Sequence, residues 1–105
     1  MWLEIPIVNS LIDQEFYITL DRVPVLLRFT WNFRSKRWVM DIKQSQGAVI
    51  VAGIAMVTNF PLTEAYKDTR LPPGDFVLID NTGMNEEAGE ESLSATHYLL
   101  YRSVL

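Results

Sequence analysis

The chain has 105 residues, of which 49% are hydrophobic and 21% are charged, and its formal net charge is −4 at pH 7. This length and composition predict one soluble β-rich domain over residues 1–105 and exclude a disordered chain. Cysteine is absent, which excludes disulfides and zinc–thiolate sites, and the acidic balance argues against general affinity for nucleic acid.

The first predicted strand covers Leu3–Ile7, where the apolar residues alternate with Glu4 and Pro6. Because proline cannot donate to a sheet ladder, we expect this strand at a sheet edge. The same two residues interrupt the apolar N-terminal stretch, and no basic leader precedes them, so we expect no signal peptide. Glu15–Leu20 is the second predicted strand, with every other residue apolar, and Asp21-Arg22 is a tight turn into the third.

The next hairpin is the clearest structural signal in the chain. Its alternating arms are Leu27–Trp31 and Trp38–Lys43, and Asn32–Arg37 connects them. The predicted register has these cross-strand pairs: Trp31 with Trp38, Phe29 with Met40, Leu27 with Ile42, and Arg28 with Asp41. This single register satisfies both an apolar face and a charge pair, which is why we favour it.

A turn at Gln44–Gly47 leads into the nearly continuous apolar run Ala48–Met56. Such a run predicts a central strand that is buried on both faces. The predicted pairs are Lys43 with Ala48, Ile42 with Val49, and Met40 with Val51, with Trp38 lying over Gly53. The longest apolar stretch, Ala48–Val57, is too short to cross a bilayer as a helix, so no membrane association is expected.

The second half of the chain contains more loop. Leu62–Lys67 could form a short helical turn, which Leu71–Gly74 would end. Asp75–Asp80 is a predicted strand, Asn81–Ser94 is an acidic loop, and Thr96–Val104 is the closing strand. The whole pattern predicts an all-β fold, a small antiparallel β-sandwich or barrel-like meander of about seven strands with little helix.

Few residues could carry chemistry. His97 is the only histidine, and we expect it to be a partly exposed structural residue. Asp80 starts a stretch that superficially resembles an EF-hand loop, but Met84 would occupy a ligand position that requires a hard oxygen. The acidic segment Asn85–Glu91 has no apolar anchor except Met84, so we expect it to be disordered. No catalytic, cofactor-binding or metal-binding residues are predicted, and no enzyme activity.

Exposed aromatic and basic residues are the best candidates for partner contacts. The hairpin tip Asn32–Arg37 combines an aromatic ring with three cations, which is typical of a contact for an acidic protein or a phosphate backbone, or of a solvated turn. The first and last strands are predicted to present exposed edges that a neighbouring subunit could complete. The candidate contact residues are Trp2, Asn32, Phe33, Arg34, Lys36, Arg37, Tyr98 and Tyr101.

Nearly the whole chain resembles the small baseplate plug proteins of contractile-tailed phages, cyanophages and prophages. The segments that carry the resemblance are Leu3–Ile7 (Leu-Glu-Ile-Pro-Ile), Trp31-Asn32, Arg37-Trp38, Asp41-Ile42 with the following glycine turn, Leu71–Asp80 (Leu-Pro-Pro-Gly-Asp-Phe-Val-Leu-Ile-Asp) and Leu99–Arg102 (Leu-Leu-Tyr-Arg). These are aromatic and turn positions rather than chemical signatures.

The resemblance implies a structural protein of the virion tail, seated where the tail tube meets the central hub and closing the tube lumen until infection. It implies contacts with tail tube and hub proteins, oligomerisation only within the assembly, no cofactor, and a stay in the host bacterial cytoplasm before assembly. An alternative from the residues alone is a soluble β-barrel module that binds an oligosaccharide or a single strand on an open β-face.

Overall fold

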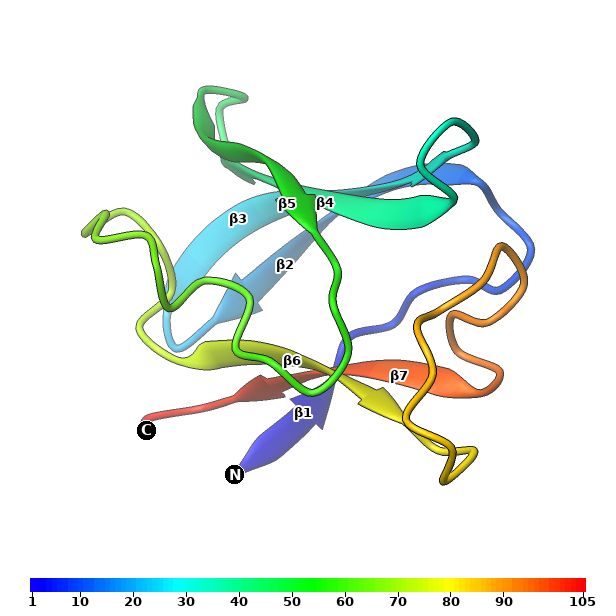
Figure 1. Ribbon diagram of the computed structural model, residues 1–105. Coiled ribbons are helices and arrows are strands. Elements are labelled where there is room, and N and C mark those ends of the chain that lie inside the picture. The colour runs from blue at the N-terminus through cyan, green and yellow to red at the C-terminus, as the bar shows by residue number, and fades with distance from the viewer.

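The computed structural model describes residues 1–105, which form seven strands and no helix. Two antiparallel sheets face each other across the core (Figure 1), which confirms the all-β prediction. The strands are β1 (Trp2–Glu4), β2 (Asp13–Leu20), β3 (Val23–Asn32), β4 (Arg37–Gln44), β5 (Val49–Ala55), β6 (Asp75–Asp80) and β7 (His97–Arg102). The structure contains no helix capable of crossing a lipid bilayer.

Strands β2 to β5 form a four-stranded meander in chain order. The β3–β4 register is the predicted one, with Trp31 opposite Trp38 and Phe29 opposite Met40. The two indoles lie edge to face with ring centroids 5.5 Å apart. Every apolar side chain of this face therefore points into the core, as the alternation requires.

Arg28 lies opposite Asp41, as predicted, but the two side chains do not form the predicted ion pair. The Arg28 guanidinium instead binds the Asp13 carboxylate of β2 through two hydrogen bonds of 2.9 and 2.7 Å. Asp41 accepts a hydrogen bond from the backbone N–H of Gly53 at 2.8 Å. The planar guanidinium fits a carboxylate in this two-bonded geometry, which explains the choice of Asp13.

The predictions for β5 are wrong in register and in burial. Ile42 lies opposite Val51 and Met40 opposite Ile54, because β5 gains one residue relative to β4 at each of two irregularities. Gly53, with φ of +74°, lies at the irregularity between Val51 and Ile54. The space at its Cβ position is open, so no indole covers it. Strand β5 is an edge strand with mostly exposed or half-buried side chains rather than a central one.

The three-stranded sheet has the order β1, β7, β6. Strand β7 is therefore its central strand, and the prediction of an exposed edge there is wrong. The outer side of β6 is covered by the segment 58–62, in which Asn59 N–H donates to Leu78 at 2.7 Å and Leu62 N–H to Phe76 at 2.8 Å. Within the segment predicted as a short helical turn, residues 62–65 form a turn and there is no helix. Of the two strands that were predicted to present an exposed edge, the first and the last, only the first (β1) lies at an edge of this sheet.

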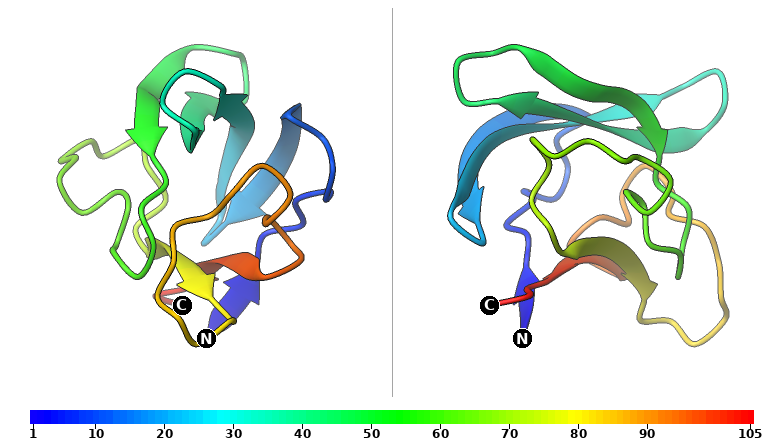
Figure 2. Two further views of the ribbon diagram at one scale, coloured as in Figure 1. Left: turned by 45° about the vertical axis from the view of Figure 1, so that its right-hand side comes forward. Right: turned by 90° about the vertical axis from the view of Figure 1, so that its left-hand side faces the viewer.

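The core lies between the two sheets and draws side chains from both. Figure 2 shows the two layers from other directions, with both termini beside the three-stranded sheet. The largest fully buried side chains are Tyr101, Phe29, Phe76, Trp38, Ile5, Leu20, Leu27, Met40, Ile42, Met56, Leu78 and Leu93. Strands from the two ends of the sequence thus share one hydrophobic cluster.

Candidate interaction surfaces

The hairpin tip is held by Asn32 itself. Its side-chain oxygen accepts hydrogen bonds from the backbone N–H groups of Arg34 (3.0 Å) and Ser35 (3.1 Å), as asparagine does in tight turns. Lys36 completes the turn with a φ of +54°. The Asn32 side chain is thus occupied in shaping the tip, and it presents Phe33, whose ring is 61% exposed.

An open depression lies beside Phe33 on the outer face of the β3–β4 hairpin, and its floor includes Arg28, Thr30 and Val39. The Arg28 charge in it is already paired with Asp13: hydrogen bonding to Arg28 lowers the pKa of Asp13, and the same contact raises the pKa of Arg28. At the tip Arg37 lies 3.8 Å from Glu87. Arg34 and Lys36 remain exposed, so the free positive charge of this surface belongs to the tip.

Tyr101 is a correction to the predicted contacts, because its side chain is buried and cannot meet a partner. Its ring packs edge to face on Phe76 with centroids 5.0 Å apart. Its hydroxyl donates to Asp21 at 2.7 Å and accepts the N–H of Gly74 at 2.7 Å. Burial, together with the Asp21 contact, raises the pKa of Tyr101.

Asp21 joins the β2–β3 turn to the C-terminal segment. Its carboxylate accepts hydrogen bonds from the Ser103 hydroxyl, from the N–H of Val104 (3.0 Å) and from Tyr101. Burial alone would raise the pKa of Asp21, but these donors hold it below its usual range. Tyr98 projects to the other side of β7, where it is half-buried and its hydroxyl donates to the carbonyl of Ala95 at 2.8 Å.

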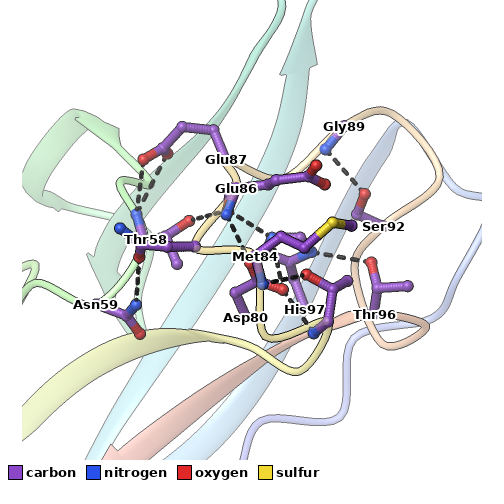
Figure 3. Close-up of polar contacts among 12 residues, drawn as sticks. Thr58, Asn59, Asp80, Met84, Glu86, Glu87, Gly89, Ser92, Thr96 and His97 are labelled. Carbon is purple, nitrogen blue, oxygen red and sulfur yellow. Dashed lines mark hydrogen bonds and ion pairs between the residues drawn. The ribbon is translucent and has the colours of Figure 1, made fainter.

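A polar network holds the acidic loop to the body of the protein (Figure 3). His97 is buried rather than partly exposed, and its ring nitrogens lie 2.8 Å from the carbonyl oxygen of Glu86 and 2.9 Å from the Thr96 hydroxyl. Asp80 accepts the N–H groups of Thr82 (2.7 Å) and Glu86 (2.6 Å). The pKa of Asp80 is lowered to about 2, mainly by hydrogen bonds from Thr82 and to a smaller extent by the bond from Glu86 and the nearby His97.

The loop also has anchors that the sequence reading missed. Ala88 and Leu93 are buried, whereas Met84, the predicted anchor, is 65% exposed. The Trp38 indole N–H donates to the carbonyl of Gly89 at 2.8 Å. The expectation of disorder over residues 85–91 is therefore not what the structure shows, and the available signal was Leu93, the one large apolar residue that follows the acidic stretch within the loop.

Glu87 connects the loop to two other elements. Its carboxylate accepts the N–H of Thr58 at 3.2–3.3 Å, as Figure 3 shows, and it lies near Arg37 of β4. No group of three or more His, Cys, Asp or Glu side chains is placed to hold a metal ion. The titratable groups brought together here stabilise the loop.

Comparison with known protein families shows which family the chain belongs to. No curated relative matches the chain. The family model described as cyanophage baseplate Pam3 plug gp18 matches residues 2–104, which is almost the entire sequence. The chain therefore belongs to this family of baseplate plug proteins and is a structural component of a phage baseplate.

Proposed function

We propose that the protein closes the tail tube where the tube meets the central hub, and that it does so by packing rather than by catalysis. The observation that carries the proposal is the amount of apolar surface that the fold leaves uncovered. The exposed large apolar residues are Met1, Trp2, Val8, Leu11, Ile12, Tyr17, Phe33, Val49, Phe60, Tyr66, Met84, Val104 and Leu105. Seven of these residues are aromatic or methionine, the types that are enriched at protein–protein interfaces.

The internal polar groups support a structural role. His97 and Asp80 are the most deeply buried titratable pair, with side chains only 2% and 1% exposed. Both are engaged by backbone groups of the acidic loop, so their hydrogen-bonding capacity is used within the fold. Such a network fixes a loop and uses both side chains within the fold.

The hairpin tip is a second contact surface in this proposal. Phe33 supplies an exposed aromatic ring, and Arg34 and Lys36 supply unpaired charge beside it. We assign the tip, with Arg37 at its base, to an acidic face of a neighbouring tail or hub protein. Aromatic and arginine side chains are the residue types that dominate such interfaces.

Complementation of a strain that lacks the gene tests the function. Wild-type protein should restore infective tails, and electron microscopy should show density at the tube–hub junction. The variant Phe33→Ser should fold normally and incorporate poorly, whereas Phe33→Tyr, which keeps an aromatic ring at the tip, serves as the matched control. Normal infective tails made without this protein would refute the proposal.

The same proposal places the protein in the virion tail and, before assembly, in the host bacterial cytoplasm. Because its interfaces are completed by other tail proteins, the isolated chain should be monomeric at low concentration. Light scattering on the purified protein measures this directly. A stable oligomer in solution would instead assign part of the exposed apolar surface to self-association.

A further inference from the structure

Strand β1 uses only one side of its backbone. The carbonyl of Met1 accepts the N–H of Ser103 at 2.8 Å, and the N–H of Ile5 donates to the carbonyl of Leu99 at 2.8 Å. In an antiparallel ladder, alternate residues direct both backbone groups to the same neighbour. Odd-numbered residues of β1 therefore face β7, and even-numbered residues direct their N–H and C=O groups away from the sheet.

The outward-facing residues are Trp2 and Glu4, and no strand lies beside them. Each offers one unpaired N–H and one unpaired C=O. Pro6 has no N–H and so ends the open stretch. The opposite edge of this sheet is different, because the segment 58–62 covers β6. The three-stranded sheet thus has a single open edge, and it is short.

The side chains of these two residues define what the edge could accept. The Trp2 indole is 50% exposed, and Glu4 is exposed without a cation near enough to form an ion pair. On β7 the cross-strand neighbour of Glu4 is Leu100, which is half-buried and cannot neutralise it. A strand added here would place one side chain against the indole and another against the free carboxylate.

We propose that β1 is a docking strand for an extended segment of a neighbouring baseplate or tail protein, with an apolar residue facing Trp2 and a lysine or arginine facing Glu4. The inference rests on the proposed function, which supplies neighbours at this position. A second copy of the chain fits less well, because antiparallel self-pairing about Leu3 would set Glu4 opposite Trp2 and leave both carboxylates without a cation. Main-chain hydrogen bonds give the affinity in this binding mode, and alternate side chains give the specificity.

Amide exchange on isolated protein and on assembled tails tests the docking. The Glu4 amide should exchange rapidly in the isolated chain and slow by roughly tenfold or more in tails, because it gains a hydrogen bond there. Thr19 is the matched control, because its amide also faces outward at a sheet edge. The N–H of Trp31 donates to the carbonyl of Ile12, so even-numbered residues of β2 direct their backbone groups toward β3, and odd-numbered residues such as Thr19 direct theirs away from it. If the Glu4 amide exchanged at the same rate in the isolated protein and in tails, the docking would be overturned. If assembled tails did not contain the chain at all, the proposed function itself would be overturned.

Proline substitution gives a second test. Glu4→Pro removes the outward N–H, and since that group makes no internal bond, the thermal midpoint of the isolated protein should stay close to wild type. Incorporation into tails should fall at least tenfold, and Thr19→Pro should incorporate normally. If Glu4→Pro lowers the thermal midpoint, Glu4→Lys keeps the N–H, reverses the charge and should still reduce incorporation. Wild-type incorporation of folded Glu4→Pro or of Glu4→Lys would refute the docking strand.

Discussion

Removal of the Trp38 side chain tests the link between the hairpin and the acidic loop. The indole is 2% exposed, packs edge to face on Trp31, and donates its N–H to the carbonyl of Gly89, 51 residues away in sequence. Trp38→Ala should lower the free energy of unfolding by about 3–5 kcal/mol, the usual cost of deleting a buried tryptophan side chain. Since domains of this size are stable by about 5–15 kcal/mol, the loss is a large fraction of the total.

Urea denaturation measures this loss, and two further variants divide it. Trp38→Phe keeps a ring in the core and removes the hydrogen bond to Gly89, so it should cost about 1–2 kcal/mol. It should also speed amide exchange in the loop. Trp31→Phe is the matched control, because no hydrogen bond joins that indole to the loop. A loss below about 1 kcal/mol for Trp38→Ala would show that the indole does not anchor the loop, and would refute this reasoning.

Three other substitutions have definite expected outcomes. Gly74→Ala should abolish or severely impair folding, because a Cβ there would lie 2.0 Å from the carbonyl oxygen of Arg102, and circular dichroism checks this. Tyr101→Phe should cost about 1–2 kcal/mol in urea unfolding through the lost bond to Asp21. The pKa of Asp80 is lowered from 3.8 to about 2, so its stabilisation is fully present above pH 4 and disappears as pH falls through 2. Asp80→Asn should therefore flatten the acid limb of stability measured from pH 6 to pH 2.

The sequence predicted the β3–β4 hairpin well and the β4–β5 pairing poorly, for one physical reason. In the first hairpin polar residues alternate with apolar ones, so a shift of one residue would turn the apolar set outward. In β5 nearly every residue is apolar, and several registers look equally good. The irregularity at Gly53 depends on a side chain of the facing strand, Asp41, and single-strand periodicity contains no information on such a contact.

The exposure of the candidate contact residues was predicted with mixed success, for a related reason. Residues 97–102 have apolar or aromatic side chains on both faces, so the sequence did not show whether Tyr98 or Tyr101 points inward. The structure buries Tyr101, where Asp21 receives its hydroxyl. The tip residue Phe33, in contrast, lies in a polar turn, and its exposure followed directly from the local pattern.

The pairing of β1 with β7 has a consequence for how the protein matures on the ribosome. The four-stranded meander is built from neighbouring hairpins, which form from local contacts once residue 55 has emerged. Strand β1 is made long before its partner, residues 97–102. Until then Leu3 and Ile5 have no sheet to join, and closing so long a loop costs more entropy than closing a hairpin. The three-stranded layer, with its open edge, therefore cannot assemble before residues 97–102 have been made.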